Sequence, residues 1–405
     1  MNKTKKILPK LRFPEFKDSG EWEEKKISDL GHTINGLTGK NGEDFGAGKP
    51  YVTYKQVFDN SIIDFKKCGK VQIGKNENQN SLQMGDVLFT TSSETPNEVG
   101  FASVLINYPK EETYLNSFCF ALRPFDIEKT QPQFFRYLFY SPIYRKSVTA
   151  IAQGSTRYNL SKGAFLELQV PIPNPKEQQK IAACLSSLDE LISAHSQKLE
   201  LLKTHKKGLM QNLFPQEGEK VPKLRFKEFE DSGEWEGIAI ESVGKVLTGG
   251  TPSKEKNEYW GGDFIWVTAQ DFKGKYIYDS ILKLTKKGKN KSKVIPKNSV
   301  LVTCIASIGL NAINKVECAT NQQINSIVCN TLHHYEFVYY AILKNTARLK
   351  NLAGQTAVPI IAKSIFEKFT IQKPISQQEQ QKIASCLSSL DELITAQSKK
   401  IEQLK

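Results

Sequence analysis

The chain of 405 residues has no apolar run that approaches the roughly 20 residues needed for a membrane-spanning helix. Its first residues, Met1 to Lys6, are polar and basic and lack the apolar core of a secretory signal. The seven cysteines form no Cys-x-x-Cys pair, and the five histidines do not lie at metal-ligand spacing beside them. These absences predict a reduced, cytoplasmic protein with no structural metal and no membrane partner.

Catalytic motifs are also missing. The segment nearest to a phosphate-binding loop, Gly46-Ala-Gly-Lys49, lacks the first glycine at the required spacing and is followed by Pro50, where a magnesium-binding Ser or Thr must stand. Paired carboxylates such as Glu111 and Glu112 lie in polar stretches, where solvation explains them. No cysteine has a persuasive histidine partner in the sequence. We therefore expect no catalytic residue, no metal site and no cofactor bound by this chain.

What the chain does contain is an internal duplication. Residues 9–23 recur as residues 222–236 with 13 of 15 positions identical, and residues 177–203 recur as residues 379–405 with 21 of 27 identical. The first offset is 213 residues and the second is 202, so the stretch between the repeats is 11 residues shorter in the second copy. Two nearly identical frames thus enclose two different inserts. This pattern predicts one scaffold that presents two unlike surfaces.

The second repeat carries a heptad pattern. Its apolar residues alternate at spacings of four and three up to Leu213, and Pro215 ends the pattern. A helix over residues 176–213 would be about 57 Å long at 1.5 Å per residue. One amphipathic helix beside a domain is an alternative, but two helices with the same stripe favour antiparallel packing on each other about a pseudo-twofold axis. The predicted helix–helix interface consists of Ile181, Leu185, Leu188, Ile192, His195, Leu199, Leu202, Ile383, Leu387, Leu390, Ile394, Gln397, Ile401 and Leu404.

Two features of these helices leave questions open. His195 and Gln397 interrupt the stripe at the same place in the two copies, either as a polar pair that sets the register or because His195 lies at a wet edge. The first helix also continues from Thr204 to Phe214, and these 11 residues have no counterpart after Lys405. The sequence leaves open whether the C-terminal helix is truncated, and with it the partner contacts at that helix end.

Each insert predicts a mixed α/β domain, and short shared motifs such as Leu37-Thr-Gly39 and Leu247-Thr-Gly249 indicate one fold with two sequences. Strand-like runs are predicted at residues 50–54, 86–90, 264–268 and 299–303, and helices at residues 133–147 and 335–349. The predicted divisions are residues 1–175 (first domain, including a repeated segment at 9–31), 176–214 (central helix), 215–221 (linker), 222–373 (second domain) and 374–405 (C-terminal helix).

The net charge of +13 is concentrated in one insert. Residues 245–372 contain 18 Lys and Arg against 8 Asp and Glu, whereas residues 32–170 contain 15 against 13. Residues 283–297 alone hold seven lysines and no acidic residue. A polyanion is the natural partner of such a segment, although a solvated lysine-rich loop has the same composition.

Several motifs in a fixed order resemble the specificity subunit of type I restriction-modification enzymes. They are Leu247–Ser253, Tyr259–Thr268, Thr320–Asn325 and Glu379–Ala384, with the last part of the pattern repeated in Gly154–Asn159 and Pro171–Ala182. The resemblance covers nearly the whole chain. It implies two similar mixed α/β target-recognition domains, each reading half of a split double-stranded DNA sequence, with the two helices as the spacer between them.

The same resemblance implies the partners, which are two modification (adenine methyltransferase) subunits and two restriction (motor-nuclease) subunits. S-adenosylmethionine, ATP and Mg²⁺ would be bound by those partners, because this chain lacks the Asn/Asp-Pro-Pro-aromatic loop and the glycine-rich turn that adenine methylation needs. The chain would direct methylation and cleavage without catalysing either. Two rival hypotheses are a stand-alone nucleic-acid enzyme with cryptic active residues and a coiled-coil scaffold that binds only proteins.

DNA reading requires Lys, Ser, Thr and backbone NH groups for phosphates, and Arg, Asn and Gln in loops for base edges. The predicted DNA contacts are Lys40, Asn41, Lys55, Gln56, Ser92, Asn97, Arg157 and Tyr158 in the first insert, and Thr251, Ser253, Lys254, Gln270, Asp271, Lys289, Lys291, Asn321 and Gln355 in the second. The amides of residues 321–323 and of Asn116 equally suit buried groups that satisfy the backbone. Packing explains the four tryptophans, at positions 22, 235, 260 and 266, better than DNA contact does.

Overall fold

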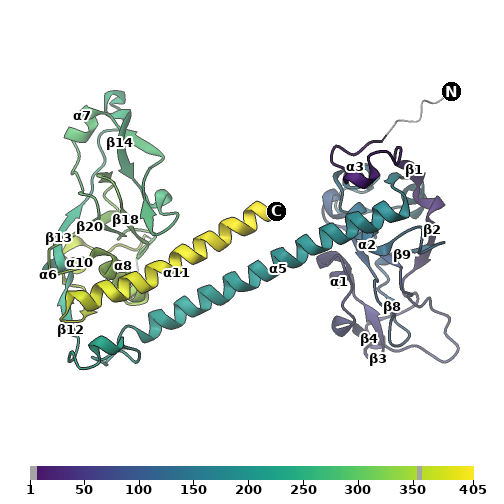
Figure 1. The fold of residues 1–405 in the computed structure, drawn as a ribbon, viewed down its shortest axis with the longest axis horizontal. Coiled ribbons are helices and arrows are strands. Elements are labelled where there is room, and N and C mark those ends of the chain that lie inside the picture. The colour runs from purple at the N-terminus through teal and green to yellow at the C-terminus, as the bar shows by residue number, and fades with distance from the viewer. Residues whose placement is uncertain (1–6, 354–357) are drawn as a thin grey trace. The chain divides into compact units, whose positions relative to one another are not determined.

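The structure is a computed structural model that describes residues 7–353 and 358–405 (Figure 1). It divides into two compact units, the first ending at Leu191 and the second beginning at Ile192. The boundary lies inside α5 (Pro175–Asn212), so this helix begins in one unit and ends in the other. In the described part of the chain, no helix is both long and apolar enough to cross a membrane.

The first unit is built on a four-stranded sheet with the order β2-β9-β5-β7 and a three-stranded sheet with the order β4-β3-β8. Two further strand pairs, β1-β11 and β6-β10, complete it. Its strands are β1 (Glu23–Lys26), β2 (Gly31–Asn35), β3 (Phe45–Val52), β4 (Gly69–Val71), β5 (Val87–Thr90), β6 (Ser92–Ser93), β7 (Ala102–Val104), β8 (Tyr114–Leu115), β9 (Cys119–Pro124), β10 (Tyr158–Asn159) and β11 (Gln169–Ile172). Its helices before α5 are α1 (Tyr54–Asp59), α2 (Pro132–Leu138), α3 (Pro142–Ala150) and α4 (Lys162–Leu166).

The second unit repeats this plan with a five-stranded sheet, β13-β20-β17-β18-β15, a three-stranded sheet, β16-β14-β19, and the pair β12-β21. Its strands are β12 (Glu236–Ala239), β13 (Gly244–Thr248), β14 (Trp260–Val267), β15 (Tyr276–Ile277), β16 (Leu282–Leu284), β17 (Val300–Thr303), β18 (Asn311–Asn314), β19 (Ala319–Thr320), β20 (Ile324–Cys329) and β21 (Thr370–Lys373). Its helices after α5 are α6 (Ile240–Val243), α7 (Lys286–Asn290), α8 (Tyr335–Lys344), α9 (Thr346–Asn351), α10 (Lys363–Lys368) and α11 (Gln377–Leu404).

The two inserts therefore share one strand order, and the prediction of one mixed α/β fold with two sequences is confirmed. In both units the three-stranded sheet combines an antiparallel and a parallel neighbour on its central strand, β3 or β14. The units differ at their edges, where β15 extends the larger sheet of the second unit and β6-β10 occurs in the first. All four predicted strand runs lie on observed strands, β3, β5, β14 and β17.

Each predicted domain helix is interrupted, which corrects the sequence prediction. The segment predicted at residues 133–147 forms α2 and α3, because Pro142 cannot donate a backbone hydrogen bond and begins a new helix that Ser141 caps by accepting from the Tyr144 NH at 3.3 Å. The segment predicted at residues 335–349 breaks at Asn345 into α8 and α9. Aromatic side chains from α2 and α8 enter the two largest cores, among them Phe135 and Phe337, both fully buried.

The two long helices lie where the heptad pattern predicts them, with small shifts at their ends, and α11 begins at Gln377 rather than at residue 374. The observed α5, Pro175–Asn212, is shifted by one residue from the predicted 176–213, and α11 ends at Leu404. Within the second unit, α11 lies beside the last part of α5 (Figure 1), and residue numbers rise on one helix as they fall on the other. His195 contacts Gln397, whereas Lys206 contacts Asp391. The predicted antiparallel packing of the two helices is therefore confirmed.

Candidate nucleic-acid interface

Two of the sequence motifs meet at one loop cluster in the second unit. The Gly249 NH donates to the Ile324 carbonyl at 3.1 Å, and the Gly250 NH donates to the Thr320 carbonyl at 2.8 Å. The Thr251 hydroxyl donates to the Gln322 side chain at 2.6 Å. A Cβ at Gly249 would lie 2.1 Å from the Thr320 hydroxyl, so only glycine permits this approach. The motif Leu247–Ser253 is thus clamped to the motif that begins at Thr320.

The first unit contains the same clamp with different residues. The Leu37 NH donates to the Leu115 carbonyl at 2.7 Å, and a Cβ at Gly36 would lie 2.1 Å from the Asn116 carbonyl oxygen. The side-chain oxygen of Asn116 accepts from the Phe118 NH at 2.9 Å, just as that of Asn321 accepts from the Gln323 NH at 3.1 Å. Both asparagines satisfy backbone groups, which is one of the two roles that the sequence predicted for them. Their side chains also shape the two loops.

The predicted DNA contacts differ in exposure. Nine are exposed, and these are Asn41, Lys55, Asn97, Arg157, Thr251, Ser253, Lys254, Gln270 and Lys291. Four are partly buried, and these are Lys40, Tyr158, Lys289 and Asn321. The three buried ones are Gln56, Ser92 and Asp271. Gln355 lies outside the described residues. The clamp brings Thr251 to the loop that contains Asn321, and the β6-β10 ladder brings Ser92 close to Tyr158 and its neighbour Arg157. The remaining described residues are distributed over other loops and short helices.

The buried members of this set have structural partners, except that the Ser92 hydroxyl itself forms no hydrogen bond within the described residues. The Gln56 side-chain oxygen accepts from the Asp64 NH at 2.9 Å. Ser92 pairs with Asn159 in the β6-β10 ladder. The Asp271 carboxylate accepts from the Thr268 NH at 2.7 Å and from the Ile281 NH at 2.9 Å. These contacts hold loops in place, which the residue types alone did not reveal.

Several predicted lysines are paired with carboxylates. The Lys40 ammonium lies 2.5 Å from Glu77, and this hydrogen bond, followed by one from the Gly74 NH, lowers the pKa of Glu77 to about 2. Lys55 lies 3.4 Å from Asp59 on the same helix. The Lys55–Asp59 pair is exposed, and such pairs are weak and can open when a stronger anion approaches.

The lysine-rich segment at residues 283–297 surrounds α7, which Thr285 caps. Three of its lysines reach acidic side chains of the second unit, namely Lys283 to Asp279, Lys287 to Glu258 and Lys289 to Glu317. Four form no ion pair within the described residues, and these are Lys286, Lys291, Lys293 and Lys297. Three of these four lysines, from Lys291 onward, lie at the end of the segment, where most of its unpaired positive charge is therefore located.

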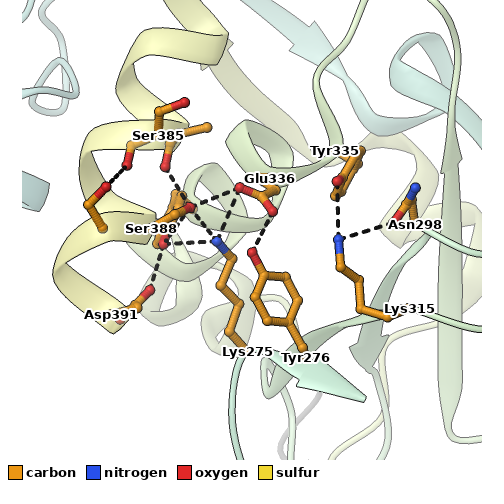
Figure 2. A network of polar contacts seen from close by, with 12 residues as sticks. Lys275, Tyr276, Asn298, Lys315, Tyr335, Glu336, Ser385, Ser388 and Asp391 are labelled. Atoms are coloured by element: carbon orange, nitrogen blue, oxygen red, sulfur yellow. Dashed lines mark hydrogen bonds and ion pairs between the residues drawn. The ribbon is translucent and has the colours of Figure 1, made fainter. Parts of the chain in front are cut away.

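A polar network attaches α11 to the domain of the second unit (Figure 2). The Lys275 ammonium lies 3.3 Å from the Glu336 carboxylate, which also accepts from the Ser388 hydroxyl at 2.8 Å. The Tyr340 hydroxyl donates to Asp391 at 2.5 Å. Burial lowers the pKa of Lys275, although the Glu336 charge opposes this effect. A domain and its long helix are thus joined by directional bonds as well as by apolar packing.

The first unit uses the same joint. The Tyr137 hydroxyl on α2 lies 3.0 Å from the Ser186 hydroxyl and donates to Asp189 at 2.9 Å. Ser186 and Asp189 stand 202 residues before Ser388 and Asp391, the offset of the second repeat. Each domain is therefore held on its own helix by equivalent side chains.

A buried ion pair marks the start of each long helix. Arg225 forms a bidentate pair with Glu379 at 2.8 Å for both bonds, and it also donates to the Gly233 carbonyl at 2.7 Å. Arg12 forms the same bidentate pair with Glu177. The sequence analysis did not single out these residues. A signal was present, because the same arginine and the same glutamate occur at equivalent positions of both copies.

The helix seam contains the predicted polar pair. The Gln397 amide donates to the His195 ring nitrogen at 2.7 Å and to the His195 carbonyl at 2.9 Å. These bonds favour the hypothesis of a polar pair over that of a His195 side chain at a solvated edge.

Of the predicted apolar positions on α11, Ile383, Leu387 and Ile401 are buried. Partly buried positions are Leu390, Ile394 and Leu404 on α11, and Ile181, Leu185, Leu188, Ile192, Leu199 and Leu202 on α5. Ile383 and Leu387 belong to a core that also contains Leu213, so they secure the helix end as well as the seam.

Two cysteines of the second unit are buried in its cores. Burial raises the pKa of the Cys304 thiol to about 11 and that of Cys318 to about 12, so both stay protonated. In the described part of the chain, no group of three or more His, Cys, Asp or Glu side chains is placed to hold a metal ion. Trp235 and Trp266 are buried and pack in cores, as predicted.

Comparison with known proteins identifies the family. The model of the type I restriction modification DNA specificity domain matches residues 19–204 and 232–405. The putative type I restriction enzyme MjaX specificity subunit of Methanocaldococcus jannaschii is 27% identical, over 95% of this chain and 90% of that protein. The MjaIX specificity subunit of the same organism is 35% identical, over 42% of this chain and only 41% of that protein.

Solved structures show the same fold. The crystal structure of a type I restriction-modification system S subunit from M. genitalium has a TM-score of 0.61 at 14% identity, covering 98% of this chain and 96% of that one. The two family matches fall on the two copies of the repeat and together include most of the chain. The protein therefore belongs to the family of type I restriction modification DNA specificity domains, and its role is DNA sequence specificity rather than catalysis.

Proposed function

We propose that this protein reads a bipartite, asymmetric DNA target, one half with each domain. It then directs adenine methylation by two modification subunits and cleavage by two restriction subunits. The observation that supports the proposal most strongly is that the two units share one fold and one set of structural contacts, whereas their exposed loops differ in sequence. The strand order, the Tyr–Asp joints and the buried Arg–Glu pairs are duplicated, whereas the predicted DNA-facing residues are not.

The exposed residues around the clamped loops are the proposed readers of the second half-site. Thr251, Ser253 and Lys254 follow the clamp directly and are exposed, and the partly buried Asn321 lies on the loop that faces them. In the first domain, the exposed guanidinium of Arg157 lies over the Phe118 ring, 5.6 Å from its centre, which leaves its planar donors available to a base edge. The exposed Asn41 and Asn97 would act with it.

The two long helices would set the gap between the half-sites. A stretch of 38 helical residues corresponds to about 57 Å, compared with about 34 Å for one turn of duplex DNA. Partner subunits would supply S-adenosylmethionine, ATP and Mg²⁺, and this chain would supply only the sequence specificity.

The decisive test is to co-express the chain with its neighbouring methyltransferase and map methylated adenines across the host genome by single-molecule sequencing. We expect a split motif with a fixed gap. A complex that forms yet methylates no split motif would contradict the proposal and favour the scaffold hypothesis. Methylation or cleavage by the purified chain alone would favour the cryptic enzyme.

The lysine-rich segment provides a quantitative test. Replacing three of the four lysines without an ion pair, Lys291, Lys293 and Lys297, with Gln should reduce the slope of log K against log salt concentration by up to about 0.9 for each phosphate that the segment no longer neutralises. Salt titrations of DNA binding by the complex would measure it. The matched control is Lys287→Gln, because Lys287 already pairs with Glu258 at 2.8 Å. An unchanged slope in the triple variant would place this segment away from the DNA.

A further inference from the structure

Three segments of the first unit meet at a strand junction. The Thr91 NH donates to the Phe118 carbonyl at 3.0 Å, and the Thr91 carbonyl accepts from the Leu160 NH at 2.8 Å. β6, which follows Thr91, pairs with β10, and Arg157 directly precedes β10. The junction therefore brings Arg157 and Phe118 close together, although they lie far apart in the sequence.

The Arg157 guanidinium is held at this junction with its donors open. Its central carbon lies 5.6 Å from the centre of the Phe118 ring, and Phe118 is 55% exposed. Such a cation–π contact holds the guanidinium at the ring without using its N–H groups. Within the described residues, these N–H groups form no hydrogen bond and no ion pair. Five donors in a fixed planar arrangement are thus available to an acceptor on another molecule.

The backbone that carries Arg157 is closed into a tight loop. Gln153 and Asn159 exchange two backbone hydrogen bonds, of 3.0 and 2.7 Å, across residues 154–158. Gly154 has a φ of 135°, and a Cβ there would lie 2.1 Å from the Arg157 carbonyl oxygen, so the loop requires glycine. The loop fixes the point from which the Arg157 side chain projects, which reduces the entropy that this side chain loses on binding.

The second unit keeps the junction and changes its side chains. The Cys304 NH donates to the Gln323 carbonyl at 2.8 Å, and the Cys304 carbonyl accepts from the Ile361 NH at 2.9 Å. Cys304 therefore takes the place of Thr91, which fixes the alignment of the neighbouring positions. The equivalents of Ser92, Phe118 and Arg157 in the second unit are Ile305, Gln323 and Val358. The backbone of the junction is common to both units, whereas the cation–π pair belongs to the first alone.

A buried hydroxyl distinguishes the first junction as well. Ser92 pairs with Asn159 in the β6-β10 ladder and is 3% exposed, yet its hydroxyl forms no hydrogen bond within the described residues. Buried polar groups rarely lack a partner unless water or a ligand supplies one. The equivalent position in the second unit holds the apolar Ile305, so the shared fold does not require a hydroxyl there.

We propose that Arg157 reads a guanine in the half-site bound by the first domain, and that Phe118 positions it for this contact. This inference rests on the DNA-reading function proposed above. A guanidinium can donate two parallel hydrogen bonds to O6 and N7 of guanine, and guanine alone presents two acceptors in the major groove. A phosphate would also accept from Arg157, but a lysine serves a phosphate as a point charge and cannot reproduce the paired contact with guanine.

Methylome mapping of the complex with its methyltransferase tests the guanine assignment. We expect Arg157→Lys and Arg157→Val each to lower the preference for guanine at one position of one half-site by about tenfold. The other half-site and the gap should stay unchanged. The matched control is Arg348→Val, because Arg348 on α9 is also exposed and lies 5.3 Å from the centre of the Phe369 ring. This control should leave the whole motif unchanged.

Binding of the same complex to modified duplexes isolates the contact. Replacing the guanine with 7-deazaguanine removes the N7 acceptor, so the wild type should bind this duplex several-fold, up to about tenfold, more weakly. The Arg157→Val complex should bind both duplexes equally. Phe118→Gln, which introduces the side chain of the second unit, should reduce the wild-type preference for guanine without abolishing it. An unchanged preference in Phe118→Gln would overturn the positioning role.

Two failures are distinguishable. A split wild-type motif that Arg157→Lys leaves unchanged would overturn the guanine assignment alone, and so would equal binding of the two duplexes by the wild type. A wild-type complex that methylates no split motif would instead contradict the proposed function, and this inference with it.

Discussion

The Arg225–Glu379 pair is the clearest energetic element at the scale of single residues. Its side chains are 6% and 1% exposed, so removing one partner strands a buried charge and costs about 3–5 kcal/mol, whereas replacing both with apolar residues is often close to neutral. We expect Arg225→Met to accelerate hydrogen exchange throughout the second unit. Arg225→Met combined with Glu379→Met should recover most of the protection. Exchange in the first unit serves as the internal control, and unchanged exchange in the single variant would contradict the prediction.

Glu77 gives a pH-dependent prediction at the same scale. The Lys40 hydrogen bond, with support from Gly74 and Gln79, lowers the pKa of Glu77 to about 2 from its usual 4.5. A carboxylate whose pKa is lower in the folded state stabilises fully above its unfolded pKa and loses this effect as the pH falls through its folded pKa. The urea midpoint of the first unit should therefore differ between wild type and Glu77→Gln at pH 7, and the difference should shrink below pH 4.5. A difference independent of pH would contradict this assignment.

At the scale of elements, the His195–Gln397 pair tests how the helix seam is specified. Gln397→Leu leaves the His195 ring nitrogen without its donor and should destabilise the second unit by about 1–3 kcal/mol. His195→Leu with Gln397→Leu makes the seam apolar and should restore or exceed wild-type stability, since buried polar pairs favour specificity over stability. A double-mutant cycle in urea measures the coupling. Additive effects of the two substitutions would show that the pair does not act as a unit.

The long helices were predictable because a heptad stripe bounded by prolines is a local signal, repeated here almost without change. The strand runs were predictable for the same reason. The sheet order β2-β9-β5-β7 was not, since strands distant in sequence pair only when the chain is packed. The helix break before Pro142 was readable from the proline, yet the aromatic periodicity continued across it and concealed the boundary.

The exposure of the proposed DNA contacts was not predictable from the sequence. Gln56 and Asp271 have residue types suited to DNA, and the structure buries both in loop-holding contacts. The clamp at Gly249 depends on contact between two loops that are far apart in the sequence. Its Thr251–Gln322 hydrogen bond joins residues 71 positions apart, and no local sequence pattern predicts such a contact. Arg225 and Glu379 were identifiable from the sequence, because the equivalent positions of the first copy hold Arg12 and Glu177. Opposite charges kept in both copies of a repeat indicate a structural ion pair of the repeated part.

At the scale of the whole molecule, helix length should control the gap in the DNA target. Duplicating residues 192–198 in α5 and residues 394–400 in α11 adds one heptad to each helix and keeps the antiparallel seam in register. Seven helical residues add about 10.5 Å, close to three base pairs at 3.4 Å each. Methylome mapping should then show unchanged half-sites and a gap longer by about three base pairs. Insertion in α5 alone is the control, and it should destabilise the seam. Altered half-sites in the variant with both helices lengthened would show that the helices contribute to base reading. That result would contradict the proposal that the domains read the bases and the helices set only the gap.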